Sequence, residues 1–295
     1  MHTITYPVPP ADDGRLIKRV IRGSIGLSYH QLSMLKAAGA LMLNGRAVHA
    51  NEPVRAGDVI ELTLVEAPGR APMPEAGPVF AVYEDEHLLI VDKEAPLACQ
   101  SSPRQAGGTL ENRLAHRYAG DPSYAFRPVN RLDKGTSGLM VVAKHAHAQM
   151  LLSQKLHSGD FEREYLAVVA GRPEPGEGEI EAPIGKADGA TVRREVRADG
   201  KAARTAYRTL ETRGGMALLR LKLFTGRTHQ IRVHLQSIGC PVLGDFLYGT
   251  EDARLPGRFA LHSAFLSLTH PASGKRLSFE SPLPAALEAL MKGME

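Results

Sequence analysis

One short stretch combines charged side chains with an apolar run in a way that suits a reactive group. In residues 127–144, Asp133 stands between Arg131 and Lys134, and Leu139 begins an apolar run typical of a buried strand. A carboxylate on a short loop at the edge of a core is held rigidly, as a catalytic group must be. The same residues equally suit a turn cap or a surface ion pair between Asp133 and Arg131, because such pairs are common and weak.

A second stretch, residues 225–249, predicts a helix with Thr228 as its N-cap. His229, Arg232 and Gln236 lie on one face of that helix at helical spacing. An arginine near the start of a helix does not complement the helix dipole, which favours an anion there. We therefore expect a carboxylate or phosphate beside Arg232, with a solvated arginine as the alternative.

The residue patterns of several other chemistries are missing from the sequence. The histidine pairs His145/His147 and His229/His234 do not form an HExxH motif, and no cysteine supplements them, so we predict no metal site. The chain also lacks the glycine-rich loops that bind nucleotides and the GxSxG pattern of a serine nucleophile.

The elements that would position these residues fall into two parts. Residues 15–39 predict two short helices, the second capped by Ser28, and Asn44–Gly45 predicts a hairpin after them. Beyond a Pro-, Gly- and Ala-rich stretch, strands predominate without the regular strand–helix alternation of a doubly wound sheet. This pattern favours an α+β fold on a mainly antiparallel, mixed sheet flanked by helices and loops. The boundaries that we predict are 1–66 for the first unit, 67–79 for a linker and 80–295 for the second unit.

Helices in the second unit are predicted at 107–120, 145–157 and about 228–238, and the last strand pair is predicted near 262–280.

Composition and charge narrow the class of protein. The 295-residue chain is 43% hydrophobic and 23% charged, as in ordinary globular proteins, and has no apolar run of the ~20 residues that a transmembrane helix needs. Its start lacks the pattern of a signal peptide, and Cys99 and Cys240 lie far apart, so we expect a cytoplasmic location. A net charge of +4 favours a polyanionic partner.

Three segments together resemble a known family. NRLDKGTSGLMVVAK, REYLAVVAG and TGRTHQIRVHLQSIGCPVLGDFLYG follow one another in the order of the three characteristic segments of the RluA-type pseudouridine synthases. The resemblance covers roughly residues 80–282 and implies the pseudouridine synthase fold. The first unit looks like the alpha-L type RNA-binding module often attached to these enzymes.

The resemblance assigns roles to individual residues. Asp133 matches the catalytic aspartate, Tyr165 the tyrosine that lies against the target uracil, and Arg232 the basic residue paired with the aspartate. Arg131 matches the arginine that enters the base stack vacated by a flipped nucleotide. Asn130 occupies the position of the usual histidine, which puts any role of that histidine in doubt here.

The implied reaction detaches uracil from ribose at nitrogen 1, turns the base and rejoins it through carbon 5. Nothing is oxidised or energised, so the resemblance implies no cofactor and no metal. Asp133 either attacks the sugar or removes a sugar proton, and the sequence leaves both routes open. A non-catalytic RNA-binding or ribosome-assembly factor on the same scaffold is one alternative. A glycosidase is another, although it would want a second carboxylate.

Structured RNA is the partner that follows from this resemblance, with ribosomal RNA favoured by the first unit and transfer RNA still possible. The residues expected to contact RNA, besides Arg131, are Arg227, His229, Arg15, Arg19 and Lys36. We expect a monomer that does not associate with membranes.

Overall fold

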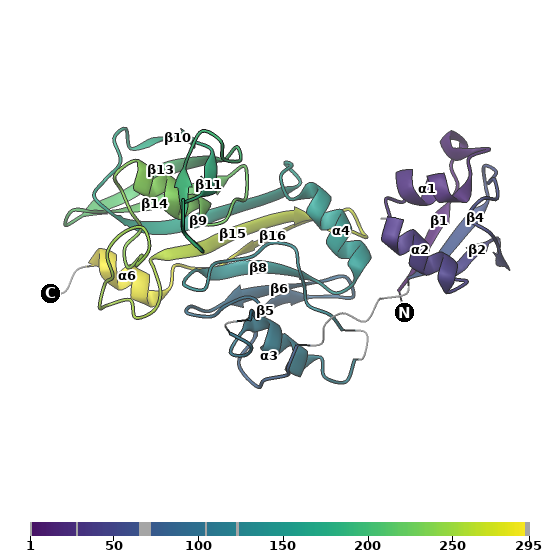
Figure 1. Cartoon of the computed structure of the whole chain (residues 1–295), viewed down its shortest axis with the longest axis horizontal. Helices are drawn as coiled ribbons and strands as arrows, with labels where there is room; N and C mark the ends of the chain where they lie inside the picture. Colours follow the sequence, from purple (N-terminus) through teal and green to yellow (C-terminus); the bar gives the residue numbers. More distant parts are fainter. Residues whose placement is uncertain (1, 28, 65–71, 104, 122–123, 293–295) are drawn as a thin grey trace.

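The computed structural model describes residues 2–27, 29–64, 72–103, 105–121 and 124–292. Figure 1 shows a small N-terminal unit beside a larger unit that is built on one long sheet. Within the part of the chain that is described, no helix is long and apolar enough to cross a bilayer.

The N-terminal unit is a four-stranded antiparallel sheet with two short helices packed against it. The strand order is β1-β4-β2-β3. The elements are β1 (His2–Pro7), the 3-10 turn η1 (Pro10–Asp12), α1 (Ile17–Gly23), α2 (Tyr29–Ala37), β2 (Leu41–Leu43), β3 (Arg46–Ala47) and β4 (Val59–Leu64).

Local sequence explains most of this unit. Asn44 and Gly45 both have positive φ, as a two-residue turn between β2 and β3 requires, so the predicted hairpin is confirmed. The predicted cap Ser28 lies outside the described residues. Strand β1 was not predicted, because its apolar side chains alternate over only six residues, and it is fixed by pairing with β4, some 50 residues later in the chain.

The larger unit contains all the remaining elements. Its helices are α3 (Leu110–Arg117), α4 (Ala146–Lys155), α5 (Gln230–Ser237) and α6 (Ala285–Lys292). Its strands are β5 (Phe80–Glu84), β6 (Leu88–Lys93), β7 (Arg127–Pro128), β8 (Ser137–Ala143), β9 (Phe161–Ala170), β10 (Glu177–Glu181), β11 (Ile184–Lys186), β12 (Arg194–Val196), β13 (Arg204–Arg213), β14 (Met216–Leu223), β15 (Leu261–Thr269) and β16 (Arg276–Glu280).

Ten of these strands form one sheet along the path β10-β13-β14-β9-β15-β8-β6-β5, with β16 beside β15 and β7 beside β8. Every pairing is antiparallel except that of β15 with β8. The predicted α+β class with a mainly antiparallel sheet is therefore confirmed, and β11 and β12 form a separate hairpin.

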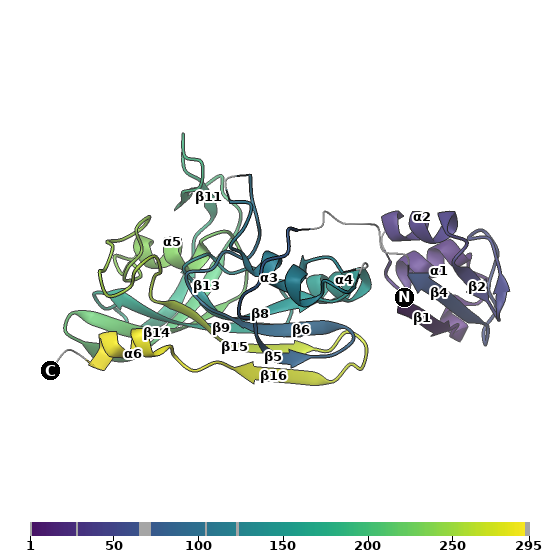
Figure 2. The same ribbon diagram turned by 90° about the horizontal axis from the view of Figure 1, so that it is seen from below.

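The helices lie mainly on one side of this sheet. Figure 2 shows α3, α4, α5 and the β11–β12 hairpin on the same side of the strands. Buried residues of β9 and β14 pack with Ile231 and Leu235 of α5 and with Leu110 and Leu114 of α3 in one core cluster. Arg232, one of the residues expected to do chemistry, is carried by α5 on this side of the sheet.

Two further differences from the expected elements have simple causes. The helix predicted over 107–120 runs only from Leu110 to Arg117, because Thr109 and Asn112 form a capping box that sets its start. Helix α6 was not predicted, since the single turn of apolar spacing before the C-terminus gives little signal.

Candidate active site

Asp133 lies on the short connection between β7 and β8. Asn130 Oδ1 accepts the backbone N–H of Val141 of β8 at 2.9 Å, which ties the loop to the sheet. Within the loop, the N–H of Thr136 donates to the carbonyl of Asp133 at 3.1 Å. The Asp133 side chain is 28% exposed. The carboxylate is thus presented to solvent by a loop whose backbone is fixed.

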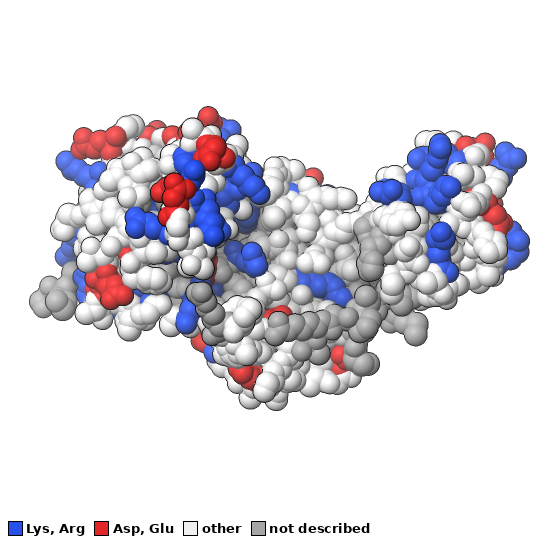
Figure 3. Space-filling model, viewed as in Figure 1, with Lys and Arg blue, Asp and Glu red and all other residues white. Residues whose placement is uncertain are grey.

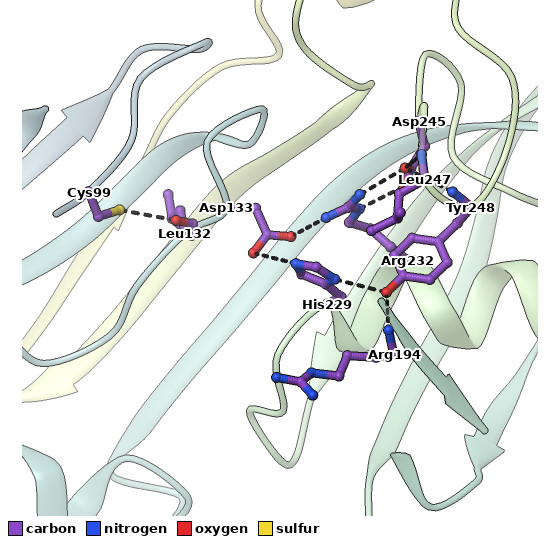
Figure 4. Close-up of polar contacts among 9 residues, drawn as sticks. All are labelled: Cys99, Leu132, Asp133, Arg194, His229, Arg232, Asp245, Leu247 and Tyr248. Carbon is purple, nitrogen blue, oxygen red and sulfur yellow. Dashed lines mark hydrogen bonds and ion pairs between the residues drawn. The ribbon is translucent and has the colours of Figure 1, made fainter. Parts of the chain in front are cut away.

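Arg232 of α5 is buried and holds one oxygen of that carboxylate. Its Nη1 donates to Asp133 Oδ2 at 2.8 Å. Its Nε and Nη2 donate to the two oxygens of Asp245, at 2.6 and 2.8 Å, and Asp245 also accepts the backbone N–H groups of Leu247 and Tyr248. Figure 4 shows the guanidinium between the two carboxylates. The expected pairing of Asp133 with Arg232, rather than with its neighbour Arg131, is present.

Two aromatic rings complete the surroundings of Arg232. The guanidinium carbon lies 4.1 Å from the ring centre of Phe259 and 4.9 Å from that of Tyr248. Burial opposes the charge of Arg232, but the bonds to Asp245 and the charge of Asp133 outweigh it and raise the pKa of the guanidinium. Arg232 therefore remains a fixed positive charge beside Asp133.

Asp133 opens into a cavity of about 680 Å³ that Tyr165, Arg131, Arg227 and His229 also line. Tyr165 projects from the middle of β9 and is 5% exposed. Burial raises the pKa of its hydroxyl, which stays protonated at neutral pH. Cavities of ~300–1,000 Å³ accept ligands of the size of a nucleoside.

The start of α5 differs from the expected one. The N-cap is His229, with φ 59° and no side-chain capping bond, and not Thr228. The left-handed backbone at His229 places its ring in the cavity wall, where Nε2 lies 4.0 Å from Asp133 Oδ1. Gln236, which was predicted on the same face as Arg232, is exposed at the other end of the helix.

The three basic residues expected in the N-terminal unit do not reach this cavity. Arg19 and Lys36 are exposed, whereas Arg15 bonds to the buried carboxylate of Asp12 and to Ser24 within its own unit. Among the residues that the structure describes, no three His, Cys, Asp or Glu side chains gather as a metal site would require.

Comparison with known proteins assigns the chain to a family. A family model described as RNA pseudouridylate synthase matches residues 87–237, about half of the chain, and spans Asp133, Tyr165 and Arg232. The chain belongs to this family of enzymes.

Relatives of this RNA pseudouridine synthase extend over nearly its whole length. An uncharacterized RNA pseudouridine synthase of Chloroflexus aurantiacus is 40% identical over 98% of this chain and 92% of its own length. The ribosomal large subunit pseudouridine synthase D of Xanthomonas campestris is 36% identical over 97% of this chain and 91% of its own. These relatives place the chain in the RluA-type branch.

Among solved structures, the pseudouridine synthase resembles human RNA Pseudouridylate Synthase Domain Containing 1. The two are 26% identical with a TM-score of 0.57 over 75% of this chain and 90% of that one.

Because the chain belongs to this family, it is an enzyme that isomerises uridine in RNA. The alternative of a non-catalytic RNA-binding factor therefore does not hold.

Sequence reasoning missed three residues of this synthase's site: Asp245, Tyr248 and Phe259. Asp245 and Tyr248 lay within the quoted segment GDFLYG, and an acidic residue after a glycine, next to aromatic residues, was the available signal. Phe259 lies outside every quoted segment and gave none.

Proposed function

We propose that Asp133 is the catalytic aspartate of this pseudouridine synthase and that its substrate is ribosomal RNA. The observation that carries the assignment is the Asp133–Arg232 pair on the wall of a nucleoside-sized cavity that Tyr165 shares. Asp133 Oδ2 is occupied by Arg232, so Oδ1 is the oxygen that meets the substrate.

The arrangement suits both chemical routes. Asp133 Oδ1 either attacks C1′ of the ribose or removes the proton on C2′, and in both cases the bond from C1′ to nitrogen 1 of uracil breaks. The base turns and carbon 5 bonds to C1′, while the bond from C1′ to Oδ1 breaks in the first route and C2′ regains its proton in the second. Carbon 5 then loses its proton and nitrogen 1 gains one. Arg232 stabilises the ionised aspartate at the start of the cycle, and the flat ring of Tyr165 holds the detached base.

A stacked uridine must leave its stack before Asp133 reaches its sugar, at a cost of a few kcal/mol. Arg131 is exposed at the cavity and its guanidinium is held by Gln100 Oε1 at 3.0 Å. We assign to Arg131 the role of filling the vacated place in the stack, and to Arg227 and His229 contacts with the flipped nucleotide.

Ribosomal RNA is the proposed target because relatives over most of the chain are named ribosomal large subunit pseudouridine synthase D. We propose that residues 1–66 bind RNA and that 67–79 link them to a catalytic domain, 80–295. Figure 3 shows Lys and Arg side chains gathered over the N-terminal unit near α1 and around the β11–β12 hairpin. Arg19 of α1 and Lys36 of α2 are exposed, and we assign phosphate contacts to them.

We further propose that the enzyme works in the cytoplasm as a monomer. Its two cysteines are buried and free, as in a reducing compartment. Light scattering of the purified protein tests the monomer, and a stable dimer would contradict it.

Replacement of Asp133 tests the assignment. Asp133→Asn keeps the size and the hydrogen bond from Arg232 but removes the charge, so we expect no isomerisation and nearly unchanged RNA binding. The measurement is tritium release from carbon 5 of uracil in ribosomal RNA, together with filter binding of the same RNA. Isomerisation by Asp133→Asn at the normal rate would refute the role of Asp133.

The target is tested separately by chemical mapping of pseudouridine in ribosomal and transfer RNA from cells with and without the gene. A pseudouridine that disappears only from transfer RNA would refute the ribosomal target.

A further inference from the structure

His229 has an unusual backbone and an open ring nitrogen beside the reactive oxygen of Asp133. Its φ of 59° is a left-handed conformation that is unfavourable for a non-glycine residue. Such strain, where it is observed, is often stored at functional sites. Here it turns the ring of His229 toward Asp133 (Figure 4).

Tyr248 determines which ring nitrogen of His229 carries the proton. The Tyr248 oxygen accepts the backbone N–H of Arg194 at 2.8 Å and lies 2.8 Å from His229 Nδ1. Among the described residues, the phenolic hydrogen has no other acceptor than Nδ1, and we therefore assign Tyr248 as the donor to Nδ1. Burial lowers the pKa of His229, which favours the neutral ring. The proton of that neutral ring is then on Nε2.

The resulting Nε2–H donor faces the cavity without a close acceptor. Asp133 Oδ1 is 4.0 Å away, which is too long for a hydrogen bond. No other acceptor is in contact with Nε2 in the part of the chain that the structure describes. A substrate oxygen placed between His229 and the approach to Oδ1 would satisfy this donor.

The chemistry at Asp133 limits which substrate oxygen that is. Oδ1 must come within ~3–3.5 Å of its reaction partner, C1′ or the hydrogen on C2′. The 2′-oxygen is bonded to C2′ and is two bonds from C1′, so both routes bring it close to Oδ1. We propose that His229 Nε2–H donates a hydrogen bond to the 2′-hydroxyl of the target nucleotide, with Tyr248 as the positioning residue that fixes the tautomer.

The inference rests on the proposed role of Asp133 as the group that meets the sugar. It makes His229 a residue that distinguishes ribose from deoxyribose at one nucleotide. A single neutral hydrogen bond of this kind is worth about tenfold in rate or binding.

The test is a cycle of two changes, one in the enzyme and one in the RNA. The RNA is a synthetic stem-loop centred on the uridine that mapping identifies, made with ribose or with 2′-deoxyribose at that nucleotide only. The enzyme change is His229→Asn, because asparagine tolerates the left-handed backbone but its amide is too short to reach. Single-turnover rates are measured for all four combinations.

We expect each change alone to slow the reaction about tenfold, and the two together to slow it no more than either one alone. If the deoxyribose penalty is the same in His229→Asn as in the normal enzyme, the contact does not exist. An unchanged deoxyribose penalty in His229→Asn is also what we expect if the missing 2′-hydroxyl slows the chemical step itself and not through a contact with His229.

Tyr248→Phe tests the positioning role, because it keeps the ring over Arg232 and removes only the hydroxyl. We expect the ribose preference to fall several-fold in this variant. The matched control is Tyr207→Phe on β13, which removes the partly buried hydrogen bond from Tyr207 to Pro175 O and lies outside the cavity lining. A ribose preference that is normal in both variants would overturn the role of Tyr248.

Failure of this inference is separable from failure of the proposed function. An inactive Asp133→Asn together with an additive cycle would leave the catalytic aspartate in place and remove only the contact from His229. Thermal unfolding of His229→Asn and Tyr248→Phe, compared with the normal enzyme, shows whether the variants are folded at the assay temperature.

Discussion

At the scale of single residues, the two carboxylates around Arg232 have different roles: one neutralises the buried guanidinium and the other is free to react. Asp245 is fully buried and binds Arg232 through two hydrogen bonds, whereas Asp133 receives one and stays partly exposed. Because Asp245 already compensates the guanidinium, Asp133 can change its charge or bonding during the reaction without leaving Arg232 unpaired in the interior.

This division predicts the effect of replacing Asp245. Asp245→Asn removes the buried negative charge and turns an amide N–H₂ group toward the guanidinium, so we expect a loss of about 3 kcal/mol in the free energy of unfolding. Activity should fall with it, because Arg232 is no longer aligned. The measurements are urea unfolding and single-turnover rate.

The control for this change is Asp199→Asn, which breaks a surface pair with Arg197 in which Asp199 is 72% exposed. That variant should lose much less stability than Asp245→Asn, because solvent screens an exposed ion pair. Equal losses in the two variants would show that the burial of Asp245 does not matter.

The pairing of Asp133 with Arg232 was predicted from the family resemblance. The spacing of residues alone was equally compatible with Asp133 in a surface ion pair and with Arg232 exposed to solvent. The contact of Asp245 with Arg232 could not be predicted from the sequence, for a physical reason. Its partner lies 13 residues earlier, and the two meet only because the chain turns back after α5. Asn130, the departure from the family pattern, has a structural use: its Oδ1 ties the Asp133 loop to β8.

At the scale of elements, the site depends on the junction between β8 and β15. This is the only parallel pairing among the strands that the structure describes, and it brings the end of the Asp133 loop beside the chain that follows Phe259. Gly138 has φ 107°, and a Cβ there would lie 2.3 Å from the carbonyl oxygen of Ser263. Only glycine permits this close approach.

Gly138→Ala should therefore destabilise the enzyme by about 2–4 kcal/mol, since the strands must separate and the backbone is strained. Gly159→Ala is the control, because a Cβ at Gly159 meets nothing within 4 Å and the backbone there is not left-handed. Thermal unfolding checks both. An unchanged melting temperature in Gly138→Ala would contradict the tight contact.

The order of the strands in space was less predictable than their existence. Most strands and helices follow from apolar periodicity, and the class of the sheet follows from the absence of strand–helix alternation. The position of β15 between β9 and β8 depends on contacts between residues about 100 positions apart, which no local pattern records.

At the scale of the whole molecule, the N-terminal unit has a hydrophobic core of its own. Its buried residues come from α1, α2, β2, β4 and the connecting loops, and Met150 of α4 packs against them from the larger unit. The residues around Asp133 belong to a different core cluster.

This separation predicts the effect of deleting residues 1–70. The truncated enzyme should bind large structured RNA more weakly, with a shallower dependence of affinity on salt, because it makes fewer phosphate contacts. Turnover on a short stem-loop should change much less. Binding to ribosomal RNA and turnover on the stem-loop are measured at several salt concentrations, and equal losses on both substrates would count against a separate docking role.

The two separate cores have a consequence for how such an enzyme changes over generations. Substitutions on the surface of the N-terminal unit can accumulate without disturbing the packing that holds Asp133, Arg232 and Tyr165. Under the proposed RNA-binding role of residues 1–66, a lineage can redirect the same isomerisation to a new RNA by altering or exchanging that unit. Catalysis and the choice of RNA can then change independently within one chain.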